Sequence, residues 1–300
     1  MNKIPFQNTT LVPVDFSDTS LHALDHAVAI AKIIEDGNPR VTLVHVIEGA
    51  EFESVSAEDV VDSSNKEGLM IEGAKNKLEK IIAAYSPKGE LPFNYIITGG
   101  KVYRKIAELA EELTADSIVM GTHGAQGWGR FIGSNASRVI QVAPCPVVTI
   151  KEKQLGNGYK NLILPLDLTK ETKQKVSWAV KIASYFKSTV HLVTITEDDE
   201  FLARRVKANL KQVEGVLKEK GITYTSTYLT EDSSSFAEAT LNFARGRDAD
   251  LIIIMTQQEK TLGEFIFGSY AQRIVKTSSI PVMAINPRAD LTGIFERTLG

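Results

Sequence analysis

Short apolar runs alternate with amphipathic segments along the first half of the chain. Residues 9–14 and 41–47 are almost wholly apolar, which is typical of strands buried on both faces of a parallel sheet. Between these two runs, apolar residues recur at the spacing of one helix face: Leu24, Ala27, Val28, Ala31 and Ile34. The pattern therefore predicts a strand, a helix and a second strand.

The same alternation continues to residue 150. It predicts helices over 60–85, 103–113 and 134–142, and strands over 93–98, 117–120 and 146–150. Repeated strand–helix units predict a parallel sheet with helices on both faces. Ligands of such sheets bind outside the carboxyl ends of the strands, where the strand order reverses.

The second half of the chain repeats the first. Four segments recur in the same order: residues 11–17 as 163–169, 41–48 as 190–197, 115–120 as 249–254, and 133–140 as 268–275. We therefore expect two domains of one fold, residues 1–152 and 153–300, joined by a linker at 151–160.

The first copy has additional residues between its second strand and the segment that begins at Ala115. The best candidate for this insertion is 49–65, which carries only acidic charges: Glu51, Glu53, Glu58, Asp59 and Asp62. Two interpretations are open, a solvated acidic linker or a lid over a ligand.

The composition of the chain excludes several functional classes. A net charge of −3 over 300 residues provides no field for collecting nucleic acid. Apolar runs such as 251–255 are too short to span a membrane, and residues 1–7 have no apolar core typical of a signal peptide. The lone Cys145 suits a reducing compartment and is expected to be a buried structural thiol, so the expected location is cytoplasmic.

Two strand ends in the first copy could bind an anion. The first is the turn from Pro13 through Asp15 to Ser17. The second is a glycine-rich loop that begins at Met120 and opens a helix: Gly121, Gly124, Gly127, Gly129, Gly133 and Ser134. Glycines let backbone N–H groups approach a phosphate, and a helix N-terminus favours its charge. A turn without a ligand is the alternative interpretation of such a loop.

These motifs together resemble those of the universal stress protein family. The resemblance covers nearly the whole chain and depends on a few motifs in a fixed order: Pro13-x-Asp15-x-Ser17, residues 45–48, Met120-Gly121-Thr-His-Gly124, Gly133-Ser134 and residues 143–148. It implies an α/β protein with two tandem flavodoxin-like domains, of the adenine nucleotide alpha hydrolase-like type. Each would have a five-stranded parallel sheet in the order 3-2-1-4-5 with helices on both faces.

The resemblance also implies an ATP site in the first copy, with or without Mg²⁺. Asp15 and the backbone at Val46 would hold adenine and ribose, and the loop glycines with Ser134 would hold the phosphates. The expected site comprises Pro13, Asp15, Val46, Met120, Gly121, Gly124, Gly133, Ser134 and Asn135. The loop 125–132 is one residue shorter than the family pattern, which puts the phosphate geometry in doubt.

The second copy departs further from the pattern. Asp167 and Gly268 remain, but Thr256 and Glu259 are expected at the positions of Gly121 and Gly124. Side chains there would crowd the phosphates, and a carboxylate would repel them. We therefore expect no nucleotide in the second copy.

The histidines support no stronger assignment. His22 and His26 lie one helical turn apart and could share a zinc ion, but without a third ligand we expect a solvated helix face. His123 is expected to be a turn residue, with phosphate contact as the alternative, and His45 a packing residue. A dinucleotide-binding fingerprint is disfavoured because the glycine loop follows the fourth strand of its unit rather than the first.

Two functions remain open. The first is an ATP-binding protein that regulates an unidentified protein partner in a stress response, with slow ATP hydrolysis at most and no assigned catalytic residue. The second is a nucleotide-free interaction or scaffold protein. The apolar edge strands 147–150 and 282–285 are expected to pair within the chain as a pseudo-dimer, and the sequence leaves a further homodimer open.

Overall fold

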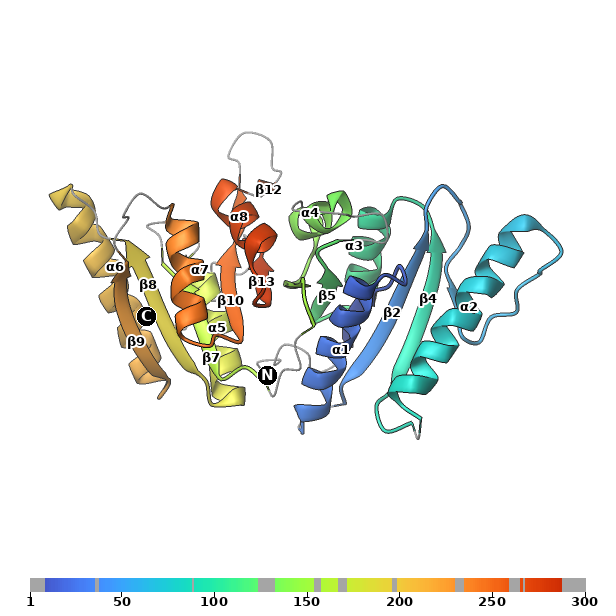
Figure 1. Ribbon diagram of the computed structural model, residues 1–300, viewed down its shortest axis with the longest axis horizontal. Coiled ribbons are helices and arrows are strands. Elements are labelled where there is room, and N and C mark those ends of the chain that lie inside the picture. The colour runs from blue at the N-terminus through green and yellow to red at the C-terminus, as the bar shows by residue number, and fades with distance from the viewer. Residues whose placement is uncertain are drawn as a thin grey trace. The chain divides into compact units, whose positions relative to one another are not determined.

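A computed structural model describes residues 9–35, 38–87, 89–123, 133–153, 158–166, 172–195, 199–229, 235–258, 265–266 and 268–287. The chain divides into two compact units, Met1–Asn157 (unit 1) and Gly158–Gly300 (unit 2) (Figure 1). Each unit is an α/β fold built on its own parallel strands.

Unit 1 is built from strands and helices that alternate along the chain. Its elements are β1 (Thr9–Pro13), α1 (Asp18–Ile33), β2 (Arg40–Ile47), β3 (Val55–Ser56), α2 (Lys66–Tyr85), β4 (Phe93–Gly99), α3 (Val102–Glu112), β5 (Ser117–Gly121), α4 (Ser134–Val142) and β6 (Val147–Ile150). The strand order is β3-β4-β2-β1-β5-β6, and every pair except β3–β4 is parallel. The five parallel strands confirm the predicted order 3-2-1-4-5.

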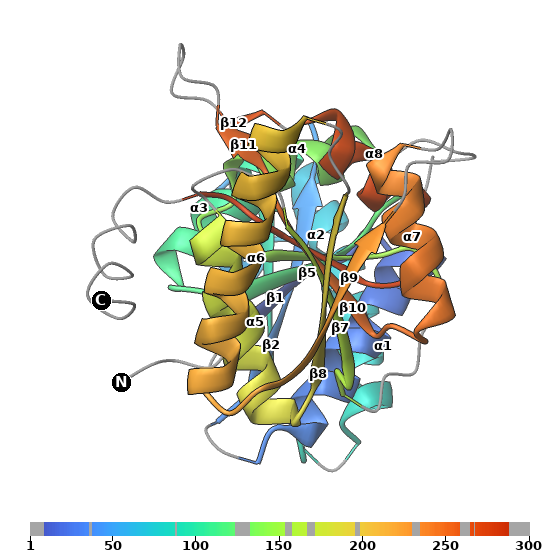
Figure 2. The same cartoon turned by 90° about the vertical axis from the view of Figure 1, so that its left-hand side faces the viewer.

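Unit 2 repeats this arrangement. Its elements are β7 (Asn161–Pro165), α5 (Thr172–Phe186), β8 (Thr189–Ile195), α6 (Glu200–Glu219), β9 (Thr223–Leu229), α7 (Phe236–Gly246), β10 (Leu251–Met255), β11 (Gln257–Gln258), β12 (Phe265–Ile266), α8 (Ser269–Thr277) and β13 (Val282–Ile285). The parallel strands have the order β9-β8-β7-β10-β13. Figure 2 shows α5 and α6 on one face of this sheet and α7 and α8 on the other. The antiparallel β11–β12 pair was not predicted.

The strand register corrects one predicted correspondence between the units. Thr122 N donates to Ile150 O at 3.0 Å, and Thr256 N donates to Ile285 O at 2.9 Å, so Thr256 matches Thr122. The counterpart of Gly121 is therefore Met255. Counting onward places Gln258, not Glu259, at the position of Gly124, although Gly124 and Glu259 themselves lie outside the described residues.

The error in the prediction has a simple origin. The segment between β10 and α8 (256–268) is one residue longer than the segment between β5 and α4 (122–133). Counting back from Gly268 therefore misses the strand register by one. The correction replaces a small polar side chain with a large apolar one at the position of Gly121.

The insertion 49–65 is not an unpaired linker. It contains β3, which pairs antiparallel with β4 through Val55 and Ser56. The Asp59 carboxylate accepts hydrogen bonds from Ser56 N and Oγ, both at 2.7 Å. The insertion thus covers the edge of the β4 strand. Helix α2 begins at Lys66 rather than at Val60, because Asn65 caps it by accepting from Gly68 N at 2.7 Å.

Three further expectations about single residues are wrong. His26 on α1 is only 2% exposed and does not lie on a solvated helix face. Tyr159, placed in the linker, is 1% exposed and packs edge-on against Phe186 of unit 2, with ring centroids 5.2 Å apart. Cys145 is half-buried rather than buried. The core of unit 2 therefore begins within the expected linker.

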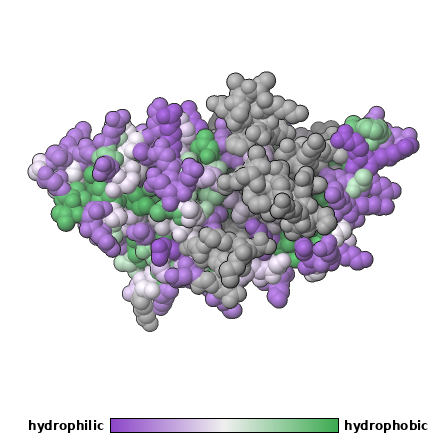
Figure 3. Space-filling model, turned by 180° about the vertical axis from the view of Figure 1, so that it is seen from behind, coloured by the Kyte–Doolittle hydropathy of each residue, from purple (hydrophilic) through white to green (hydrophobic). Residues whose placement is uncertain are grey.

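Polar and hydrophobic residues are unevenly distributed on one face of the molecule (Figure 3). Seen from behind, polar residues cover most of the coloured surface, and hydrophobic residues form separate patches (Figure 3). Within the described parts of the chain, no helix is both long enough and apolar enough to cross a membrane.

Two glycines of α2 provide a test of how closely the insertion is packed. A Cβ at Gly68 would lie 1.9 Å from Asp62 O, whereas a Cβ at Gly73 would meet nothing within 4 Å. Gly73→Ala should stabilise the protein by about 0.5–1 kcal/mol through helix propensity. Gly68→Ala should destabilise it, because the insertion must move. Urea unfolding of both variants measures the difference, and equal stabilisation would contradict this packing.

The buried His26 predicts a specific pH dependence. Burial lowers the pKa of His26 from 6.5 to about 4, so the unfolded chain binds a proton at higher pH than the folded chain. Above about pH 6.5 the imidazole is neutral in both the folded and the unfolded chain, and the free energy of unfolding is not reduced. As the pH falls from about 6.5 to 4, only the unfolded chain binds the proton, so the free energy of unfolding falls by about 3 kcal/mol. In His26→Gln the urea midpoint should fall less steeply over this range. A slope equal to that of the wild type would contradict the assignment.

Candidate functional site

A cavity of about 540 Å³ opens at the carboxyl ends of β1, β2 and β5. Strand β1 lies between β2 and β5, so the strand order reverses at this point. Eight of the nine expected site residues line the cavity: Pro13, Asp15, Val46, Met120, Gly121, Gly133, Ser134 and Asn135. The ninth, Gly124, lies outside the described residues.

The turn from β1 to α1 presents Asp15 beside this cavity. Asp15 Oδ1 accepts hydrogen bonds from Ser17 N at 3.0 Å and from Ser17 Oγ at 2.5 Å. Ser17 in turn caps α1 by accepting from Ser20 N at 3.3 Å. The start of the helix therefore orients the carboxylate.

Phe16 adopts an unusual backbone conformation in this turn, with φ of +66°. The conformation costs a non-glycine residue about 1 kcal/mol or more, so contacts of the side chain must compensate. The Phe16 ring packs on His45, with centroids 4.6 Å apart, and Lys77 Nζ lies 4.9 Å from its centre. These contacts from β2 and α2 hold the turn, and no pattern in the sequence indicated them.

His45 joins β2 to the same turn. Its Nδ1 lies 2.7 Å from Val14 O, and because a carbonyl can only accept, Nδ1 carries the proton. Burial lowers the pKa of His45, which favours the neutral ring at pH 7. His45 is therefore a packed residue with a satisfied polar group, as expected, and it fixes the residue before Asp15.

The opposite wall is formed by the end of β5, which approaches α1 very closely. A Cβ at Gly121 would lie 2.9 Å from the Thr19 carbonyl carbon and oxygen. Thr19 Oγ1 also donates to His123 O at 2.7 Å, and Thr122 Oγ1 lies 2.8 Å from His123 Nδ1. Only glycine fits at position 121 without moving the β1–α1 turn.

Helix α4 begins at the cavity, and its N-cap residue has no side chain that could bond the first amides. Gly133, its N-cap, makes no side-chain cap, and its own N–H donates to Thr122 O at 2.8 Å. The first amides of a helix and its dipole favour an anion at this end. Ser134 and Asn135, which line the cavity, are the first two residues of this helix.

Several residues that line the cavity were not expected from the sequence. They include Glu48 directly after β2, Val102 and Ile106 on α3, and Arg138 on α4. Val102 and Ile106 are four residues apart and therefore share one face of α3, a signal that the periodicity of that helix contains.

Among the described residues, no group of three or more histidine, cysteine, aspartate or glutamate side chains could hold a metal ion.

Unit 2 has larger side chains at the corresponding positions. Helices α3 and α7 begin after equivalent strands, and α4 and α8 follow equivalent glycine N-caps. Val102 therefore corresponds to Phe236, and Asn135 to Tyr270. The Phe236 and Tyr270 rings are stacked, with centroids 5.1 Å apart and an interplanar angle of 19°. Together with Met255, they place larger side chains at the positions that Gly121, Val102 and Asn135 have in unit 1.

Comparison with known proteins gives a consistent result for both halves of the chain. The model of the universal stress protein family matches residues 8–151 and 158–286. Universal stress protein MJ0531 of Methanocaldococcus jannaschii is 34% identical over 143 residues, which cover 47% of this chain and 81% of that protein. Universal stress protein MJ0577 of the same organism is 30% identical over 156 residues, 48% of this chain and 94% of its own length.

A solved structure shares the fold over nearly the whole chain. The crystal structure of a universal stress protein from Archaeoglobus fulgidus DSM 4304 matches with a TM-score of 0.73 and 19% identity. The match covers 94% of this chain and 99% of that one.

The close approach at Gly121 yields a prediction about stability. Gly121→Ala should destabilise the protein by about 1–3 kcal/mol, because the added Cβ forces the Thr19 backbone to move. Gly246→Ala is a matched control, since a Cβ there meets nothing within 4 Å. Thermal unfolding of both variants tests this, and an unchanged melting temperature for Gly121→Ala would show that the contact is not as tight as described.

Proposed function

The chain belongs to the universal stress protein family, and from this premise we propose that unit 1 binds one ATP molecule in the cavity beside Asp15. The proposal rests on one observation: the same cavity is lined by the Asp15 carboxylate, by Gly121 and by the N-terminus of α4, where no side chain caps the helix. Its volume of about 540 Å³ lies within the usual range for small-molecule sites.

The groups around the cavity suit the two ends of a nucleotide. By the family resemblance, Asp15 and the backbone at Val46 contact adenine and ribose. Gly121 and the start of α4 at Gly133 and Ser134 accept the phosphates, where backbone N–H groups and the helix dipole stabilise negative charge. A Mg²⁺ ion, if used, would accompany the nucleotide phosphates.

Unit 2 is proposed to bind no nucleotide. Met255 stands in place of Gly121, and the stacked Phe236 and Tyr270 replace Val102 and Asn135. These side chains occupy positions that would have to stay open for a ligand. Unit 2 then serves as a structural partner or as a surface for other proteins.

We propose a regulatory role, in which bound ATP changes the surface offered to a protein partner during a stress response in the cytoplasm. The residues described around the cavity suggest no catalytic base, so ATP turnover is expected to be slow at most. The competing function is a nucleotide-free scaffold, which the short loop 125–132 favours.

One measurement separates these two functions. The purified native protein is denatured, and the released small molecules are identified by mass spectrometry. ATP at about one equivalent per chain supports the proposal, and titration calorimetry of the nucleotide-free protein should find one site. Two equivalent sites would contradict the asymmetry between the units, and no binding would favour the scaffold.

The role of Asp15 is tested by substitution. Asp15→Ala should weaken ATP binding by about 1.5–3 kcal/mol, the usual contribution of hydrogen bonds to a charged group. Asp167→Ala is the matched control from the second copy, and its ATP affinity should equal that of the wild type. Thermal unfolding without nucleotide monitors the loss of the Ser17 contacts. Equal losses of affinity in both variants would place the site elsewhere.

A further inference from the structure

Arg138 contributes a positive charge to the wall of the cavity. It lies on α4, one helical turn after Ser134, and it is exposed. Its guanidinium carbon lies 5.3 Å from the centre of the Tyr103 ring on α3. Arg104 also contacts Tyr103, with Nε donating to the hydroxyl at 3.1 Å. Among the described residues, no carboxylate forms an ion pair with Arg138.

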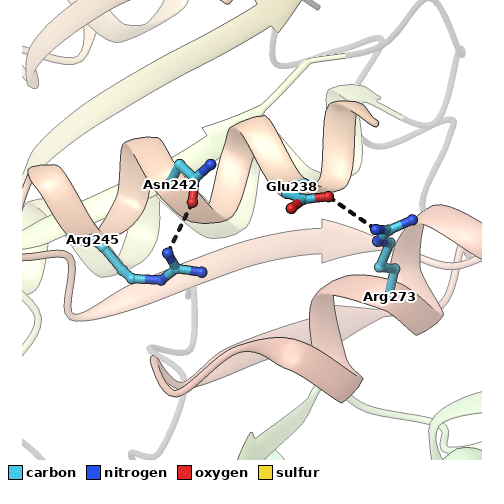
Figure 4. A network of polar contacts seen from close by, with 4 residues as sticks. All are labelled: Glu238, Asn242, Arg245 and Arg273. Atoms are coloured by element: carbon cyan, nitrogen blue, oxygen red, sulfur yellow. Dashed lines mark hydrogen bonds and ion pairs between the residues drawn. The ribbon is translucent and has the colours of Figure 1, made fainter. Parts of the chain in front are cut away.

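The corresponding arginine in unit 2 is neutralised. Counting from the first residues of α4 and α8, Arg138 corresponds to Arg273, and by the same count along α3 and α7, Arg104 corresponds to Glu238. Arg273 Nη2 forms an ion pair with Glu238 Oε2 at 2.9 Å (Figure 4). The two units thus carry the same arginine beside opposite charges on the neighbouring helix.

We propose that Arg138 contacts a phosphate of the nucleotide bound in unit 1 and makes the site prefer phosphorylated nucleotides to the nucleoside. This inference rests on the proposed function. A planar guanidinium binds phosphate through two parallel hydrogen bonds, which lysine or a neutral side chain cannot reproduce.

The charges around the cavity indicate which part of the cavity holds the phosphates of the nucleotide. Asp15 and Glu48 come from the ends of β1 and β2, and both would repel phosphates. Arg138 and the uncapped amides belong to α4, which follows β5. The nucleoside therefore lies toward the two carboxylates and the phosphates toward α4. Arg104 adds positive charge beside Arg138 and offers it no acidic partner.

The charge pattern of unit 2 provides the test variant. Arg104→Glu places a carboxylate at the position of Glu238, where it can pair with Arg138 and withdraw it from the ligand. Arg104→Gln is the matched control, since it removes the same positive charge without offering a partner. Both changes are on an exposed helix position, and thermal unfolding should show that both variants fold.

Titration calorimetry with ATP and with adenosine measures the preference directly. Arg104→Glu and Arg138→Met should each weaken ATP binding by about tenfold to a hundredfold, the loss of a charge-assisted contact, and leave adenosine binding unchanged. Arg104→Gln should lose clearly less than Arg104→Glu. Arg273→Met, the control from unit 2, should bind both ligands as the wild type does.

The outcomes distinguish this inference from the proposed function. If the wild type binds neither ATP nor adenosine, the proposed function is wrong and the inference falls with it. Two results would show that Arg138 does not contact the phosphates, provided that the wild type binds ATP. Either Arg138→Met loses ATP affinity and adenosine affinity equally, or it loses neither. Equal losses in Arg104→Glu and Arg104→Gln would likewise overturn the role of Arg138, because loss of the Arg104 side chain alone would then explain the effect.

Discussion

The contact between Gly121 and the Thr19 backbone is the constraint on which the rest of unit 1 depends. Because position 121 has no side chain, the end of β5 can lie against the β1–α1 turn, and the Thr19–His123 hydrogen bond fastens the two. In the same turn, the left-handed backbone of Phe16 is supported by the contact of its ring with His45. Asp15 and the start of α4 are consequently held around one cavity.

The two units share one arrangement of parallel strands but differ in the side chains around it. Their parallel strands have the same order, and the hydrogen bonds at Thr122 and Thr256 are equivalent. The units differ in short added elements, β3 in unit 1 and the β11–β12 pair in unit 2. They also differ in side chains near the strand ends and on the neighbouring helices, where Met255 replaces glycine and Glu238 pairs with Arg273. A sheet held by its buried strands tolerates such changes at the ends of its strands and in the segments that connect them.

The local pattern of the sequence was sufficient for the repeat, the alternation of strands and helices and the strand ends at which a ligand binds, whereas the strand order and the eight expected residues that line the cavity came from the family resemblance. Buried parallel strands are short, continuous apolar runs, and ligand-binding residues follow their carboxyl ends, so both signals are local. Short elements escaped this reasoning. Strand β3 has two residues within an acidic segment, and it forms only because β4 offers an unpaired edge. The burial of His26 depends on what packs against α1, which periodicity cannot reveal.

The sequence by itself determined that this chain is a tandem pair of α/β units and that Asp15 and the glycines of the first unit stand at strand ends. Only the tertiary structure decided which residues face one another across that end of the sheet. The opposite surroundings of Arg138 and Arg273 depend on packing between neighbouring helices. These are contacts between residues distant in sequence, and no local pattern encodes them.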